Sequence, residues 1–275
     1  SDMKSGLAVM AFVLGELAES GCVPRKTIVF AGTCDEERGG LGAKEIIKEY
    51  PDLFPELLLI GEPTSCQAGV AQKGCIWLKL SVSGKTSHGA EPWQGINALE
   101  QGFGLLADLR EELKREEHPV LGHSTLQITM AEGGIAPNMT PDRAKFLADI
   151  RIVPPLNEKE VLNRLECLMQ KRCEVYNGGL AFVPEITNYR MPVETGPENQ
   201  WLHRLKGFIG DDEGETGINY FTDASILLTA WPDSPALLFG PGEPQMCHKP
   251  NEYVEISKYL EAIRVMEKFC WYIAK

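Results

Sequence analysis

The feature of this sequence that most constrains the fold is an alternation of apolar runs and amphipathic helical segments near its start. Apolar side chains recur at helical spacing over residues 3–20, and this pattern stops at Gly21. Two continuous apolar runs, 27–32 and 57–61, are typical of buried parallel strands, and a helical pattern over 40–50 separates them. This βαβ order predicts a mostly parallel sheet with helices on both faces.

A second pattern begins at Ile76, where apolar and polar residues start to alternate. The expected order is then strand, helix, two strands, helix and strand, which is typical of a ferredoxin-like α+β module. Its elements are expected at residues 76–82, 98–117, 124–131, 145–153, 157–173 and 180–186.

After this module the first pattern resumes, with helices expected at 199–209, 223–230 and 256–273 and a strand at 236–239. We therefore predict an α/β protein in which one sheet domain is built from two separate pieces of sequence. Residues 1–75 and 189–275 would form this domain, and residues 76–188 would be the inserted α+β module.

The charge balance narrows the class of partner. Among 275 residues, Asp and Glu number 39 and Lys and Arg number 27, which gives a formal net charge of −12. Nucleic acids and anionic membranes both require a concentrated basic surface, so neither is an expected partner. The apolar runs are far shorter than the roughly 20 residues of a membrane-spanning helix. We expect a soluble protein.

The eight cysteines contain no C-x-x-C pair. In a chain of this length such usage favours reduced thiols over a disulfide framework, and hence a cytoplasmic setting. A zinc cluster built from cysteines is not expected, because thiolate ligands usually come in pairs two to four residues apart.

Several acidic residues and one histidine stand where ligands bind in α/β proteins, at the carboxyl ends of strands. Glu36 and Glu37 follow the first predicted strand, Glu62 follows the second, and His248 lies downstream of a later one, while Asp2 precedes the first helix. Taken singly, each has an ordinary interpretation as a helix cap, a loop charge or a surface residue. If they converge, their mutual repulsion calls for a cation, and carboxylates with imidazole suit Zn²⁺, Mn²⁺ or Co²⁺.

Six short motifs carry a resemblance to a known family. They are SDMKSG at 1–6, DEE at 35–37, GEPT at 61–64, SH at 87–88, GPG at 240–242 and HKPNE at 248–252. In this order they resemble the motifs of the di-zinc aminoacylase and carboxypeptidase superfamily of metallopeptidases, most closely its acetylornithine deacetylase and succinyl-diaminopimelate desuccinylase branch. The resemblance covers the whole chain, and it implies that the inserted module is a lid and dimerisation domain.

The resemblance implies a role for each of the five residues. Asp2 would bridge two zinc ions, Glu37 and His248 would complete one metal site, and Glu62 would serve the other; Co²⁺ or Mn²⁺ would be possible substitutes. Glu36 would be the general base that takes a proton from the metal-activated water.

The resemblance also implies residues that bind the substrate. His88 would reach the site of the partner subunit and stabilise the oxyanion, and Asn138 and Arg151 would hold the substrate carboxylate. The ordinary alternatives are a surface position for His88 and a structural ion pair for Arg151. Thr222 and Gly240 would belong to loops on the substrate side.

One motif of the family is absent from these 275 residues. Members carry a His-x-Asp motif on a strand before the segment of Asp2, and none of the five histidines here is followed two residues later by Asp. We therefore expect a fragment of a longer enzyme that leaves sheet edges bare, binds at most one metal ion well, and has low or no activity alone.

The predicted function is a metal-dependent amidohydrolase that removes the acyl group from an N-acyl amino acid or diamino acid, acting as a cytoplasmic homodimer joined through the lid domain. One alternative is a dipeptidase or carboxypeptidase of the same superfamily, with short peptides as substrates. An alternative of another class is a non-catalytic dimerising fragment, whose folding would not respond to chelators.

Overall fold

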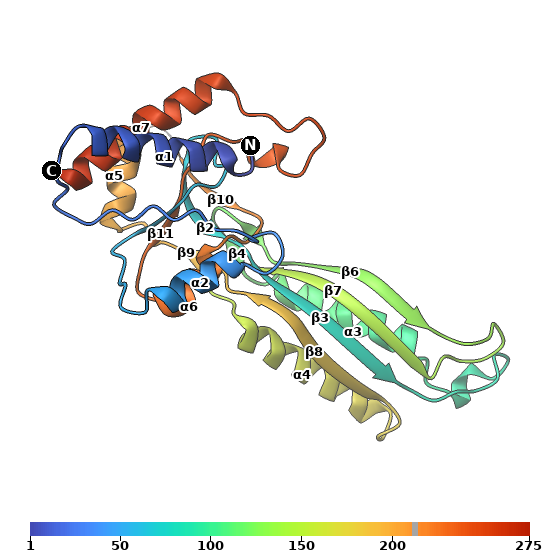
Figure 1. Ribbon diagram of the computed structural model, residues 1–275. Coiled ribbons are helices and arrows are strands. Elements are labelled where there is room, and N and C mark those ends of the chain that lie inside the picture. Colours follow the sequence, from blue (N-terminus) through green and yellow to red (C-terminus); the bar gives the residue numbers. More distant parts are fainter. Residues whose placement is uncertain (211–213) are drawn as a thin grey trace. The chain divides into compact units, whose positions relative to one another are not determined.

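The computed structural model describes residues 1–210 and 214–275. The chain forms two compact units: unit 1 comprises Ser1–Gln72 and Val193–Lys275, and unit 2 comprises Lys73–Pro192. Figure 1 identifies their elements. None of the helices in the described ranges is both long enough and apolar enough to span a bilayer.

Unit 1 contains a mixed five-stranded sheet. Four strands lie in the order β1-β11-β2-β10, and β9 also pairs with β2. The pairs β1/β11 and β10/β2 are parallel, whereas β11/β2 and β2/β9 are antiparallel. The α/β class is confirmed, with a more mixed sheet than the rhythm of the sequence indicates. The strands are β1 (Leu58–Ile60), β2 (Ala68–Gln72), β9 (Val193–Glu194), β10 (Glu215–Ile218) and β11 (Ala236–Leu238).

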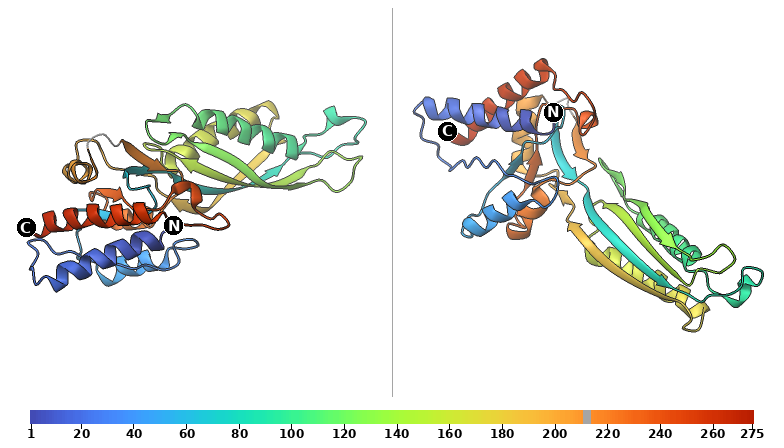
Figure 2. Two further views of the ribbon diagram at one scale, coloured as in Figure 1. Left: turned by 90° about the horizontal axis from the view of Figure 1, so that it is seen from above. Right: turned by 45° about the vertical axis from the view of Figure 1, so that its right-hand side comes forward.

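The helices of unit 1 pack in pairs. Helix α1 lies alongside α7, as Figure 2 shows, and α2 packs against α6 around a small core that contains Ala43 and Trp231. Helix α5 packs on α7, where Trp201 meets Phe269 with ring centroids 6.2 Å apart. The helices are α1 (Lys4–Glu19), α2 (Leu41–Glu49), α5 (Gln200–Ile209), α6 (Ala224–Ala230) and α7 (Ile256–Ala274), and one 3-10 turn, η2, spans Pro244–Met246.

The predicted strand at 27–32 is wrong. These residues form no strand, and Val29 and Phe30 are 62% and 44% exposed. An extended apolar run becomes a strand only when a neighbour satisfies its backbone groups. In the described part of the chain β1 pairs with β11, and no strand pairs with 27–32. The loop is held instead at its start, where the Arg25 amide donates to the Ala274 carbonyl.

Unit 2 has the ferredoxin-like arrangement that the sequence predicts. Its four-stranded sheet has the order β6-β7-β3-β8, and every neighbouring pair is antiparallel. Two helices pack on one face of this sheet and enclose a leucine-rich core (Figure 2). The elements are β3 (Gly74–Ser83), η1 (Pro92–Gln94), α3 (Ala98–Leu113), β4 (Glu117–His118), β5 (Gly122–His123), β6 (Thr125–Gly133), β7 (Arg143–Ile152), α4 (Glu158–Val175) and β8 (Ala181–Arg190).

Side-chain caps set the helix starts in unit 2. The Asn97 side chain accepts from two amides at the start of α3, and Asn157 forms a capping box with Glu160 at the start of α4. The prediction that the first of these helices continues to residue 117 is wrong, because α3 ends at Leu113. Arg164 of α4 donates to the Glu112 carbonyl, and the chain then turns into the β4–β5 hairpin.

Candidate metal centre

Glycines allow the segments of the candidate site in unit 1 to approach closely. A Cβ atom on Gly6 of α1 would overlap the carbonyl oxygen of Gly61, and one on Gly240 would lie 2.5 Å from the carbonyl oxygen of Glu62. The loop after β11 is also tied to the loop after β1, since the Cys66 amide donates to the Gly240 carbonyl at 2.9 Å. These contacts hold the start of α1 and the ends of β1 and β11 together.

A tight turn presents Glu36 and Glu37. The Asp35 carbonyl accepts from the amides of Gly39 at 3.0 Å and Gly40 at 2.6 Å, which closes the loop just before α2. The two neighbouring side chains have different surroundings. Glu37 is exposed, whereas one oxygen of Glu36 is buried.

Asp2, Glu37 and His248 converge. One ligand atom from each lies within 4.8 Å of the other two. His248 Nε2 lies 2.9 Å from Glu37 Oε1 and 3.3 Å from Asp2 Oδ2. The Glu37 carboxylate is the largest cause that raises the pKa of His248. A divalent cation would replace the imidazole proton at this position, because metal-bound histidine is neutral.

Glu62 lies buried beside this group. Its side chain is 4% exposed, and no described residue donates a hydrogen bond to Oε2. Burial, followed by the charges of Asp2 and Glu36, raises the pKa of Glu62 to about 9, and Asp223 contributes in the same direction. Carboxylates crowded in this way are stable as anions only with a cation among them. Oxygen and imidazole donors fit a divalent metal such as Zn²⁺.

Three further residues lie around these carboxylates without having been singled out from sequence. Asp223 is buried at the start of α6, and its negative charge raises the pKa of Glu62. Tyr220 Oη lies 3.7 Å from Cys247 Sγ. Burial raises the pKa of the Cys247 thiol to about 11, and Asp2 adds to this shift. A phenol or thiol outside any motif gave no sequence signal, whereas Asp223 immediately follows the predicted residue Thr222 and could have been found.

Thr222 and Gly240 take part in packing. The Thr222 hydroxyl donates to Gln72 Oε1 at 2.6 Å and accepts from the Ala224 amide, which fixes the start of α6. Gly240 accepts from two amides of the loop after β1 and leaves no room for a side chain. The structure therefore places both beside the carboxylate cluster as supports of the backbone, and a role toward substrate stays a prediction.

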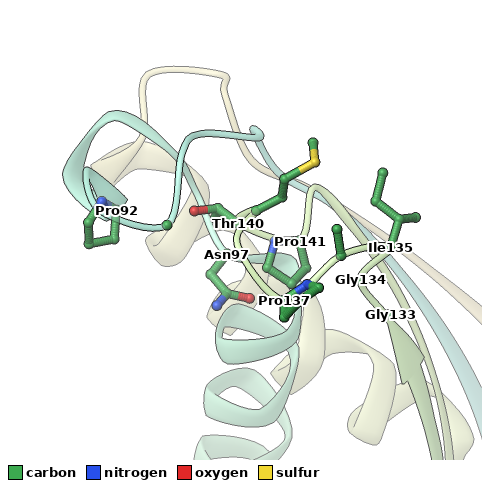
Figure 3. A pocket seen from close by; sticks show the side chains of 11 residues that line it. Pro92, Asn97, Gly133, Gly134, Ile135, Pro137, Thr140 and Pro141 are labelled. Atoms are coloured by element: carbon green, nitrogen blue, oxygen red, sulfur yellow. The ribbon is translucent and has the colours of Figure 1, made fainter.

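Unit 2 brings His88 and Asn138 onto neighbouring loops. His88 forms an isolated bridge with Met139, and the Gly89 amide donates to the Asn138 carbonyl at 2.8 Å. Both side chains are exposed. Other residues of the same loops, 89–97 and 133–141, line a pocket of about 630 Å³, and Figure 3 shows Asn97 from the first loop and Pro137 and Thr140 from the second; neither His88 nor Asn138 lines it.

The side chain of Arg151, on β7, forms an ion pair with Asp149. Its guanidinium donates to both oxygens of Asp149, at 2.6 Å and 2.9 Å, and Trp77 Nε1 donates to the same carboxylate at 3.0 Å. This is the structural ion pair that sequence reasoning held as the alternative to carboxylate binding.

Comparisons with known proteins find similarity along nearly the whole chain. Residues 70–177 match the model of the peptidase dimerisation domain of the M20 peptidases. An acetylornithine deacetylase from Shigella sonnei is 29% identical over 287 aligned residues, which cover 99% of this chain and 71% of that protein. These matches support the M20 metallopeptidase superfamily for this chain. The relatives are hydrolases, so the chain is a hydrolase, and the match to a metallopeptidase domain implies dependence on a divalent metal.

Two solved structures share the fold of this chain. The aminopeptidase PepT from Bacillus cereus has a TM-score of 0.76 at 20% identity, covering 99% of this chain and 71% of that one. A metallo-carboxypeptidase of the M20 family from Sulfolobus solfataricus has a TM-score of 0.66 at 16% identity. The match covers 98% of this chain and 75% of that chain. The fold that the chain shares with these two structures therefore covers both of its units.

Proposed function

We propose that this M20 homologue is a zinc-dependent deacylase that cleaves the amide bond of an N-acyl amino acid or N-acyl diamino acid. The observation that carries the proposal is the convergence of Asp2, Glu37 and His248 beside the buried Glu62. The similarity to an acetylornithine deacetylase along nearly the whole chain supports an acyl amino acid as substrate. Co²⁺ or Mn²⁺ would be able to replace Zn²⁺.

Asp2, Glu37 and His248 would hold one ion, and Glu62 would face a second position next to Asp2. When bound, a divalent metal polarises the scissile carbonyl and acidifies the attacking water. Glu36 neighbours a ligand without belonging to the converging group, so it is suited to take the proton from water and deliver it to the leaving amine. Burial of one Glu36 oxygen would keep this proton transfer away from bulk water.

We further propose a homodimer formed through unit 2, which the match to the dimerisation domain supports. His88 and Asn138, side by side on their loops, would act on the substrate, and Arg151 would do so only by leaving Asp149. The absence of disulfides among the eight cysteines, all of which lie in described ranges, is consistent with a cytoplasmic location.

A hydrolysis panel tests the proposed reaction. The panel contains N-acetylornithine, N-succinyl-diaminopimelate, other N-acyl amino acids and dipeptides, and we expect the low turnover of these 275 residues alone to favour an acylated amino acid over dipeptides. Glu36→Gln keeps the size of the base and removes its basicity. We expect this variant to retain its metal while turnover falls about 100- to 10,000-fold.

Either of two results would contradict this account. Undiminished hydrolysis by Glu36→Gln would show that Glu36 is not the base. Preferential cleavage of dipeptides would replace the deacylase with a dipeptidase of the same superfamily.

A further inference from the structure

The loop that carries His248 is tightly turned. Between η2 and α7, the Lys249 amide donates to the Met246 carbonyl and the Glu252 amide donates to the Lys249 carbonyl, each at 3.2 Å. His248 and Asn251 have φ angles of 60° and 59°, in the left-handed region that residues other than glycine rarely adopt. Such a backbone persists only where surrounding contacts hold it in place.

Glu252 provides such contacts. Its Oε1 accepts a hydrogen bond from the Asp2 amide at 2.6 Å, across 250 residues of sequence. Within its own loop, the Glu252 amide donates to the carbonyl of Lys249, the residue after His248. Glu252 thus contacts the backbone of Asp2 with its carboxylate and belongs to the turn that carries His248.

We propose that Glu252 is a positioning residue of the metal centre, which joins the backbone of Asp2 to the tight turn that carries His248 and so fixes the spacing of the two side chains. The inference rests on the proposed function, since it concerns the same site. Hydrogen bonds from amides to a carboxylate are among the stronger ones in proteins. Groups that orient metal ligands in this way typically change metal affinity by about 10- to 100-fold when removed.

A purely structural role for Glu252 makes a different prediction. A loop charge that only stabilises the fold would lower the melting temperature of the metal-free protein and leave the metal affinity of the folded protein unchanged. Metal affinity therefore separates a positioning role from a structural one.

The experiment compares three variants by titration with Zn²⁺ against a chromophoric chelator, together with thermal unfolding of the metal-free proteins. Glu252→Met keeps the length of the side chain and removes both oxygens. Glu252→Gln keeps one oxygen acceptor. Glu255→Ala is the matched control, because Glu255 lies in the same loop and its carboxylate accepts only from the Ser257 hydroxyl within the described contacts.

We expect Zn²⁺ affinity to fall about 10- to 100-fold in Glu252→Met, to stay within a few-fold of the parent in Glu252→Gln, and to be unchanged in Glu255→Ala. If Glu252→Met does not fold, Glu252→Asp replaces it, and its shorter carboxylate should likewise weaken binding.

Two outcomes overturn the proposal, and they have different meanings. Parent protein that binds Zn²⁺, with undiminished affinity in Glu252→Met or Glu252→Asp, overturns this inference alone. Parent protein that binds no Zn²⁺ overturns the proposed function and this inference with it.

Discussion

At the scale of single residues, the carboxylate cluster depends on glycines, which have no reactive side chain but let backbone segments approach closely. Gly6 of α1 faces the backbone of Gly61, and a methyl group there would overlap its carbonyl oxygen. We predict that Gly6→Ala lowers the free energy of unfolding by about 1–3 kcal/mol, as overpacking does, and weakens metal binding by moving Asp2. Gly15→Ala on the same helix is the control, because no described heavy atom lies within 4 Å of its Cβ position.

Denaturant unfolding and metal titration of both variants test this account of the helix contact. The control should gain about 0.5–1 kcal/mol, since alanine is the better helix former. Equal stability of the two variants would show that Gly6 does not hold α1 against β1.

Positions near the ends of predicted elements made Asp2, Glu37, Glu62 and His248 candidates, although the strand expected before Glu37 does not form. Their meeting could be predicted only through the resemblance of their motifs to a known family, because Asp2 and His248 are far apart in sequence and their approach depends on backbone contacts at glycines. Sequence reasoning also missed the Tyr220–Cys247 contact, since neither residue lies in a pattern with chemical meaning of its own.

At the scale of elements, Arg164 connects α4 to the chain that follows α3. It donates to Glu116 and to the Glu112 carbonyl. The hydrogen bond from Arg164 is the largest cause that lowers the pKa of Glu116. A carboxyl group whose pKa is lowered by folding contributes stability above its ordinary pKa of about 4.3, and this contribution is lost as the pH falls through the lowered value.

We therefore predict that Glu116→Gln is less stable than the parent protein at pH 7, and that the difference shrinks on acidification below pH of about 4. Urea unfolding at pH 7 and at pH 3 measures this difference in the free energy of unfolding between the two proteins. A difference that is equal at both values would show that the Glu116 charge does not contribute.

Helices were easier to predict than strands, and the physical reason is locality. The α4 helix has an amphipathic repeat and a capping box within its own sequence, so its start could be predicted. A strand depends on a partner far away in the chain. The apolar run 27–32 has the composition of a strand but no partner in the described residues, whereas β2 and β10 pair with each other without a clear signal in their sequences.

At the scale of the whole molecule, metal binding should stabilise the fold. A ligand that binds only the native state adds about 2.7 kcal/mol at a free concentration 100 times its dissociation constant. We predict that Zn²⁺ raises the melting temperature and that EDTA reverses the increase. A melting temperature that responds to neither would favour a non-catalytic dimerising module.

The most direct test of the metal centre is the amount of zinc bound per chain after dialysis, in the parent protein and in His248→Ala. His248 lies 2.9 Å from Glu37 and 3.3 Å from Asp2, so its removal leaves only carboxylates in the converging group. We predict about one zinc ion per chain in the parent protein and its loss in the variant. No zinc in either protein, or equal amounts in both, would contradict a metal centre formed by Asp2, Glu37 and His248.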